Sequence, residues 1–252
     1  MHRRCWNRKI RMTRLSVNVN KIATLRNARG GKVPNVVQAA KRIQSYGAQG
    51  ITVHPRPDQR HITYADVKAL REVVYTEFNV EGYPSASFLN LVLEVRPDQV
   101  TLVPDPPDAL TSNHGWDVIQ HRLLLQQTTK SLQDSGMRVS LFTGTEGEQL
   151  EAAAAIGADR IELYTEPYAE GFAQGNPESV LAFAKAAAFA HTCGLGVNAG
   201  HDLDANNLKH FVSNVPFLKE VSIGHALISD ALYDGLKQTV KTYLSCLDAS
   251  IT

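Results

Sequence analysis

The chain has 252 residues, of which 43% are hydrophobic and 20% are charged. This composition is typical of a globular protein with a large core, and no apolar run reaches the length of a membrane span, so we expect no contact with a membrane. The net charge is +1, but residues 1–11 hold five basic residues and no acid, which leaves 21 basic and 25 acidic residues in the remainder. A mildly acidic body argues against a nucleic-acid-binding surface.

The N-terminal segment, residues 1–11, is basic and lacks the apolar stretch of a signal peptide. We expect it to be a disordered tail, or to precede a true start at Met12, and a basic nucleic-acid-binding arm is the alternative. The three cysteines, Cys5, Cys193 and Cys246, are odd in number and lack the spacing of metal ligands. Reduced thiols in a cytoplasmic protein explain this pattern best.

In chain order, short apolar segments alternate with longer segments of helical periodicity. The predicted strands span residues 15–20, 50–55, 76–82, 99–104, 138–144, 159–165, 195–201 and 220–225. The predicted helices span residues 33–47, 64–74, 85–96, 117–136, 146–157, 179–194, 204–214 and 226–247. Glycines follow four of the helical segments, as a C′ glycine does, at Gly47, Gly136, Gly157 and Gly194. The segment between the first strand and the first helix is expected to be a basic loop.

Regular alternation of strands and helices predicts a parallel sheet in an α/β protein. An open doubly wound sheet is possible, but eight regular units favour closure into a (β/α)8 TIM barrel. No Pro/Ser-rich linker divides the chain. We therefore expect residues 12–252 to form one catalytic domain.

Ionisable and amide side chains fall at the C-terminal ends of the predicted strands, where enzymes of this fold place their active sites. Those on or directly after the strands include Asn18, Asn20, His54, Arg56, Glu81, Glu162, His201 and His225. A lone histidine at a strand end is more often structural. Three histidines and two glutamates expected on one rim make catalysis the better interpretation.

Basic and glycine-containing segments near the same rim indicate phosphate binding. Arg29 follows the first strand, and Arg56 and His61 follow the second in a segment stiffened by prolines. A guanidinium group can bind two phosphate oxygens at once. Gly224 and His225 directly precede the last predicted helix, whose N-terminal amides could bind a second anion.

Eight segments together resemble the pyridoxine 5'-phosphate synthase family, in order and spacing, over about residues 12–247. They are NVNKIATLRNARG (18–30), GITVHPRPDQRHIT (50–63), FNVEG (78–82), TLVPD (101–105), VSLF (139–142), RIELYT (160–165), VNAGHDL (197–203) and IGHALI (223–228). The resemblance implies a (β/α)8 barrel with extra helices, a homo-octamer, and no metal or organic cofactor. It also implies a transferase reaction of vitamin B6 biosynthesis, in which 1-deoxy-D-xylulose 5-phosphate and 3-amino-2-oxopropyl phosphate condense to pyridoxine 5'-phosphate, releasing inorganic phosphate and water.

The resemblance also implies roles for individual residues, position by position. His54 and Glu81 match proton acceptors, His201 matches the proton donor, and Glu162 matches a carboxylate that stabilises the transition state. The remaining matches are to substrate contacts. The aminooxopropyl phosphate site matches Asn18, Arg29, Gly224 and His225, and the deoxyxylulose phosphate site matches Arg56, His61 and Thr111.

Three positions depart from the family's pattern, which commonly shows Asp-His at 20–21 and Gly at 202. This chain has Asn20, Lys21 and Asp202 there. An amide cannot take a proton and a lysine is cationic at neutral pH, so we expect Asn20 and Lys21 to orient the sugar phosphate without transferring protons. Asp202 can keep a substrate contact that is made through its backbone amide.

Two other interpretations remain at this stage. One is a different phosphate-handling barrel, such as an isomerase, an aldolase or a thiazole-forming synthase, or a metal enzyme that uses His54, Glu81 and His201 as ligands. A Schiff-base aldolase needs a lysine at a strand end, and no interior of a predicted strand carries one. The other is a non-catalytic scaffold or phosphometabolite-binding protein, which would not need the acids and bases of the rim.

Overall fold

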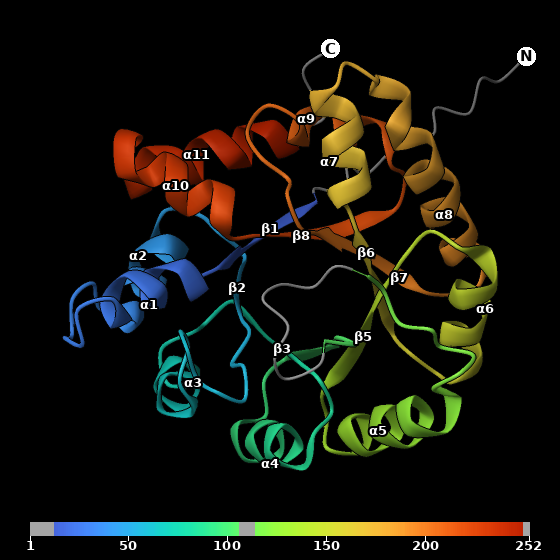
Figure 1. Ribbon diagram of the computed structural model, residues 1–252, viewed down its shortest axis with the longest axis horizontal. Coiled ribbons are helices and arrows are strands. Elements are labelled where there is room, and N and C mark those ends of the chain that lie inside the picture. Colours follow the sequence, from blue (N-terminus) through green and yellow to red (C-terminus); the bar gives the residue numbers. More distant parts are fainter. Residues whose placement is uncertain (1–12, 106–113, 249–252) are drawn as a thin grey trace, which may run out of the picture.

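The structure is a computed structural model that describes residues 13–105 and 114–248. Its strands are all parallel and close into a barrel in sequential order, with β8 paired to β1, as Figure 1 shows. They are β1 (Arg14–Asn18), β2 (Gly50–Val53), β3 (Glu77–Gly82), β4 (Gln99–Leu102), β5 (Arg138–Thr143), β6 (Arg160–Tyr164), β7 (Gly196–Gly200) and β8 (Leu218–Ile223). The predicted (β/α)8 barrel is therefore confirmed. The tail predicted for residues 1–11 and the predicted site residue Thr111 lie outside the described residues.

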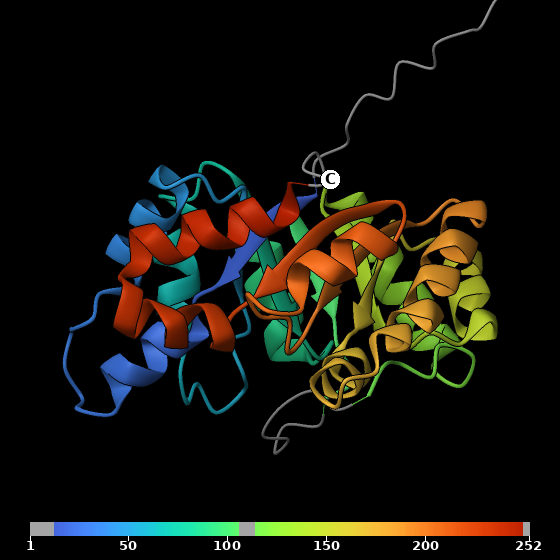
Figure 2. The ribbon, with the colours of Figure 1, turned by 90° about the horizontal axis from the view of Figure 1, so that it is seen from above.

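Helices surround the barrel, and the described residues form more helices than the eight that were predicted. They are α1 (Asn20–Asn27), α2 (Val36–Ser45), α3 (Tyr64–Arg71), α4 (Ala86–Val95), α5 (Arg122–Asp134), α6 (Gly147–Ala155), α7 (Glu166–Ala173), α8 (Val180–Thr192), α9 (Leu208–Asn214), α10 (His225–Asp234) and α11 (Leu236–Leu247), with a 3-10 turn η1 (Pro177–Ser179) before α8. Figure 2 shows α1 and α10 at the same end of the barrel, and the two helices are in contact. None of the described helices is long and apolar enough to cross a membrane.

The helices differ from the sequence-based prediction at three places. The segment after β1 was predicted as a loop, yet Asn20–Asn27 forms α1, which buries only Ile22 and Ala23 and so has little apolar periodicity. The helix α7 follows β6 directly and was not predicted. The single helix predicted for residues 226–247 is divided at Gly235, which has a φ of +77° and separates α10 from α11.

The side chains that face the barrel axis are polar, while the apolar core lies between the strands and the helices. Ser16 and Thr52 share a hydrogen bond of 2.7 Å, and the Thr101 hydroxyl donates to Asn79 at 3.0 Å. All four side chains are buried. Apolar residues of the same strands, such as Val17, alternate with them and face the helices.

The N-terminal end of the barrel is closed by an ionic cluster of Arg14, Glu77, Arg138, Arg160 and Glu220. Arg14 lies 2.6 Å from Glu77 and 3.2 Å from Glu220, and Glu77 also pairs with Arg138 and, at 3.6 Å, with Arg160. Two carboxylates are thereby held among three guanidinium groups at the end opposite to the rim of polar residues. We expect this cluster to serve stability.

Burial raises the pKa of Glu220 in this cluster to about 8, with the Glu77 charge adding to the effect. A carboxyl whose pKa is higher in the folded state stabilises the fold most below about pH 4.5, and this contribution is lost as the pH rises through about 8. We therefore expect Glu220→Gln to weaken the fall in Tm between about pH 5 and pH 8, measured by thermal unfolding. A variant whose Tm falls as steeply as that of the wild type would contradict this.

Candidate active site

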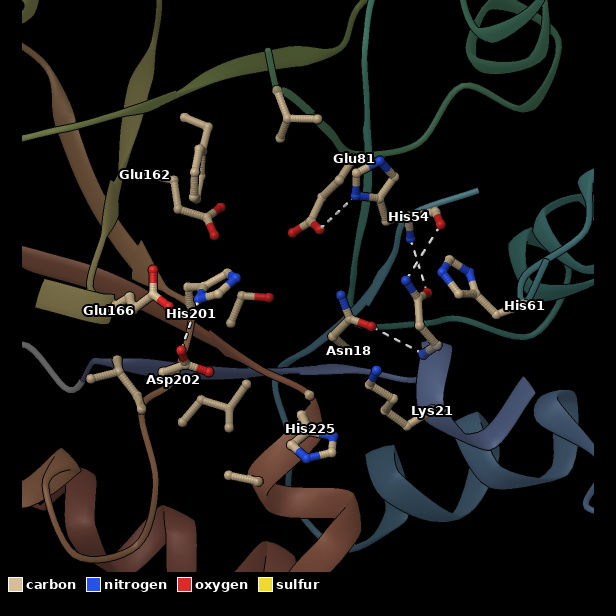
Figure 3. Close-up of a pocket in the computed structure, with 18 of the residues that line it drawn as sticks. Asn18, Lys21, His54, His61, Glu81, Glu162, Glu166, His201, Asp202 and His225 are labelled. Carbon is tan, nitrogen blue, oxygen red and sulfur yellow. Dashed lines mark hydrogen bonds and ion pairs between the residues drawn. The ribbon is translucent and has the colours of Figure 1, made fainter. Parts of the chain in front are cut away.

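A cavity of about 620 Å³ opens at the carboxyl ends of the strands. The predicted residues that line it are Asn18, Asn20, Lys21, His54, Arg56, His61, Glu81, Glu162, His201, Asp202, Gly224 and His225. Figure 3 shows Glu162 and His201 on one side of this cavity and His54 and His61 on the other. Side chains that are far apart in the sequence are thus brought together by the barrel, as the strand-end argument predicted.

Among the predicted site residues that the structure describes, Arg29 does not line the cavity. It follows the end of α1 and is exposed. Its phosphate contact stays a prediction from the resemblance. Conversely, Glu166 and Asp204 line the cavity and were not predicted. Glu166 directly follows the sixth predicted strand, so its strand-end position was a signal that could have identified it.

His54 and Glu81 form a largely buried pair at the ends of β2 and β3. The distance from Nδ1 of His54 to Oε2 of Glu81 is 3.9 Å, and the side chains are 9% and 12% exposed. Burial lowers the pKa of His54 well below its usual value, and the Arg56 charge lowers it further. Burial raises the pKa of Glu81 well above its usual value, and the nearby Glu162 adds to the effect. Near neutral pH the His54 imidazole is therefore uncharged, and the Glu81 carboxyl group holds a proton more readily than an exposed glutamate does.

Glu162 is held across the cavity by β6. Its side chain is buried, and burial raises its pKa to about 7, against the opposing effects of the His201 charge and the Thr101 hydroxyl. Gly200 on the neighbouring strand β7 makes room for this carboxylate, because a Cβ there would lie 2.5 Å from Oε1 of Glu162. A carboxyl group with a pKa near 7 can both give and take a proton at physiological pH.

The β2–α3 loop places the guanidinium group of Arg56 and the imidazole of His61 in the cavity. Arg56 is buried and lies 2.7 Å from Asp105. Burial, reinforced by the Arg56 charge, lowers the pKa of His61 to about 4. The loop is tied to α1, since Arg26 and Asn27 donate hydrogen bonds to the His61 carbonyl at 3.1 and 2.8 Å. This positioning role of Arg26 and Asn27 was not predicted from the sequence.

Asn20 contacts His54 through both atoms of its side-chain amide. The backbone N–H of His54 donates to Oδ1 at 3.0 Å, and Nδ2 donates to the His54 carbonyl at 3.4 Å. Asn20 therefore positions the end of β2, a role that was not predicted; the predicted orientation of the sugar phosphate by Asn20 stays a prediction. Lys21, the next residue of α1, is exposed and lines the cavity.

We expect Asn20→Ala to lower kcat by about tenfold and the free energy of unfolding by about 1 kcal/mol, because the His54 N–H loses its acceptor and the end of β2 loosens. Steady-state kinetics and thermal unfolding measure the two effects. Thr24→Ala, on the exposed side of the same helix, is the control and should change kcat little. An Asn20→Ala enzyme with the wild-type kcat would show that this contact does not matter for catalysis.

Gly224 ends the barrel beside β1 and precedes α10. A Cβ at Gly224 would lie 3.0 Å from the Cβ of Asn18, so the close approach of the two strand ends favours glycine. His225 is the first residue of α10, and both His225 and Gly224 line the cavity. The first-turn amides of α10 thus lie at the edge of the cavity, where helix N-termini favour anions.

Within the described ranges, no three His, Cys, Asp or Glu side chains are grouped closely enough to hold a metal ion. The described cysteines, Cys193 and Cys246, are free thiols.

The fold and the cavity define a (β/α)8 barrel with a buried set of acid–base groups at the carboxyl ends of its strands, a class of protein that is mostly enzymatic. The family described as "Pyridoxal phosphate biosynthesis protein PdxJ" matches residues 15–249. The chain belongs to this family.

Individual relatives agree with this assignment. The chain is 57% identical over 236 residues to the pyridoxine 5'-phosphate synthase of Christiangramia forsetii, covering 94% of this chain and 100% of the relative. It is 55% identical over 238 residues to that of Parabacteroides distasonis, with 94% and 100% covered. Among solved structures, 3-keto-L-gulonate-6-phosphate decarboxylase from Vibrio cholerae superimposes with a TM-score of 0.65 at 12% identity, over 96% of this chain and 100% of that one, and supports the barrel fold alone.

Proposed function

We propose that this chain is a pyridoxine 5'-phosphate synthase. The reaction condenses 1-deoxy-D-xylulose 5-phosphate with 3-amino-2-oxopropyl phosphate to pyridoxine 5'-phosphate, inorganic phosphate and water. Family membership over nearly the whole chain supports the activity. The observation that carries the assignment of the site is the cavity that joins His54, Glu81, Glu162 and His201.

The reaction needs several proton transfers of opposite sense. The substrate amine attacks a ketone and water leaves, then a carbon acid loses a proton and phosphate is eliminated, and ring closure needs a further proton transfer and dehydration. No single group can act as acid and base in all these steps at once. Two sets of groups on opposite sides of the cavity can divide them, and each general acid–base step contributes about 10²–10⁴-fold to the rate.

The charge states of the buried groups suggest how the steps are divided. His54 is uncharged near neutral pH and can take a proton directly. Burial raises the pKa of Glu81 well above its usual value, so this carboxyl group takes and holds a proton more readily than an exposed glutamate, and its contact with His54 offers a route for proton exchange. Glu162, with a pKa of about 7, is suited to stabilise positive charge that develops in the transition state, and His201 acts as the proton donor.

The two phosphates are proposed to bind at opposite sides of the cavity. Arg56 and His61, with Lys21, would bind the sugar phosphate. Thr111, which the resemblance assigns to the same site, would contact the same substrate. Gly224 and His225 at the start of α10, together with Asn18, would bind the aminooxopropyl phosphate. Two anchored phosphates convert an encounter of small molecules into an aligned pair.

Further properties follow from the family and stay proposals. We propose that residues 12–252 act as a single catalytic domain, that the enzyme works in the cytoplasm without a cofactor, and that it assembles with copies of itself into an octamer. Light scattering tests the assembly, and a monomer at micromolar concentration would overturn it.

Incubation of the purified protein with both phosphates tests the function. We expect pyridoxine 5'-phosphate, detected by absorbance and mass, together with an equal amount of new inorganic phosphate. Omission of either substrate is the control. Failure of a folded protein to form product, with each substrate supplied in excess in turn, would overturn the proposal.

A further inference from the structure

His201 and Asp202 leave β7 in an unusual backbone conformation. Their φ angles are +86° and +57°, a region that residues other than glycine adopt at a cost. The surrounding chain holds them there. The Thr165 hydroxyl donates to the Gly200 carbonyl at 2.7 Å and contacts the His201 carbonyl, and Asn207 donates to the Asp202 carbonyl at 3.1 Å. Aspartate tolerates the left-handed region better than most residues, so a carboxylate can be presented from this turn.

This conformation places the Asp202 carboxylate on the imidazole of His201. Oδ2 of Asp202 lies 3.2 Å from Nδ1 of His201, and Figure 3 shows the contact at the side of the cavity. The edge of the imidazole also packs against Tyr164, with ring centroids 5.1 Å apart. The His201 side chain is 20% exposed and the Asp202 side chain 47% exposed. The contact with His201 is the main cause that lowers the pKa of Asp202, so the carboxylate is ionised throughout the neutral range.

We propose that Asp202 is a positioning residue for His201, whose Nδ1–H its carboxylate accepts, so that Nε2 is the nitrogen that exchanges a proton with substrate. The inference rests on the proposed role of His201 as proton donor. A carboxylate on one imidazole nitrogen selects the tautomer and stabilises the imidazolium that forms when the other nitrogen is protonated. The chain thus combines a histidine from the end of β7 with an orienting acid from the very next residue.

The neighbouring acids do not duplicate this contact. Glu162 lies on the neighbouring strand, β6, and the His201 charge lowers its pKa against the effect of burial. Glu166 lines the cavity from the first turn of α7. Among the described residues, the carboxylate that makes an ion-pair contact with the His201 ring is that of Asp202.

Asp202→Asn removes the charge while it keeps the size of the side chain and its tolerance of a positive φ. We expect kcat to fall by about tenfold, a part of the ~10²–10⁴-fold of a general acid–base step, with the KM of each substrate changed by less than about twofold. Asp202→Gly relieves the backbone and should lose as much, because the carboxylate is missing in both. Glu170→Gln, which removes a charge from α7 away from His201, is the matched control and should keep the wild-type kcat.

A double-mutant cycle with His201→Gln separates an effect through His201 from a general one. We expect Asp202→Asn to cause no further loss of kcat once His201 is absent. A loss of equal size in both backgrounds, or a kcat within about twofold of the wild type in Asp202→Asn alone, would overturn the proposal. Restoration of kcat by Asp202→Gly would show that the backbone, and not the carboxylate, is what matters.

A second measurement does not depend on turnover. Diethyl pyrocarbonate modifies an unprotonated imidazole nitrogen, and peptide mass analysis follows the modification of His201 alone. The reaction is run well above the usual imidazole pKa of about 6.5, so that loss of the stabilised imidazolium does not change the rate. If Asp202 holds the proton on Nδ1, Nε2 carries the lone pair, and Asp202→Asn should slow the modification several-fold, because the asparagine amide can donate to Nδ1 instead. An unchanged rate would contradict the proposal even if the wild-type protein formed no product, in which case the proposed function would fail separately.

Discussion

Replacement of Glu81 by glutamine should lower kcat by about 10³-fold and change the KM of each substrate little. Glutamine keeps the shape of the side chain but can neither give nor take a proton. Glu81 lies 3.9 Å from His54, and burial raises its pKa well above the usual value, so its environment suits the proton transfer that we propose for it. Steady-state kinetics with each substrate varied in turn measure the effect.

The same variant separates a chemical role from a structural one. Because the pKa of Glu81 is higher in the folded than in the unfolded state, its contribution to stability is lost as the pH rises through the folded-state pKa. Glutamine does not ionise, so the variant should keep its Tm better than the wild type does at alkaline pH. A structural ion-pair role for Glu81 predicts the opposite pattern, namely a lower Tm with kcat intact.

Replacement of Glu77 by glutamine should have the largest effect on stability, about 3 kcal/mol or a fall in Tm of roughly 6–12 °C. Glu77 pairs with Arg14, Arg138 and Arg160, and the side chain of Arg160 is 13% exposed. The change leaves a mostly buried guanidinium group without its main counter-charge. The side chains of Arg14 and Arg138 are 33% and 29% exposed. Water therefore screens these two pairs in part, and we expect a loss of stability at the lower end of the range for breaking a buried ion pair.

The matched control is Glu94→Gln, which removes the exposed pair that Lys68 and Glu94 form at 2.6 Å. An exposed pair contributes less than about 1 kcal/mol, so this variant should unfold close to the wild-type temperature. At temperatures where the protein is folded, Glu77→Gln should keep the wild-type kcat, because the ionic cluster lies at the opposite end of the barrel from the cavity. Equal Tm values for the two variants would show that the cluster is not stabilising.

The sequence by itself determined the architecture and most members of the cavity. Short apolar segments, helical periodicity and glycines after helices are local signals that do not depend on the rest of the fold. Parallel strands share one carboxyl end, so residues such as His54, Glu81 and His201 could be assigned to one rim before their distances were known.

Tertiary contacts decided what those residues can do. The contacts of Asn20 with the backbone of His54 and of Arg14 with Glu77 join segments that are distant in the sequence and that only strand pairing brings together. The helix α1 has little apolar periodicity of its own and forms against the barrel rim, so no local pattern revealed it.

The charge states of the site depend on the same closure. The pKa of His54 falls and that of Glu162 rises to about 7 chiefly because the folded chain removes both groups from water. The contact between Asp202 and His201 joins neighbours in the sequence, yet it exists because Thr165 and Asn207, from other segments, hold the turn at positive φ. The sequence specifies which residues are present. Desolvation and backbone strain arise only in the packed molecule, and these two effects determine the chemistry of the site.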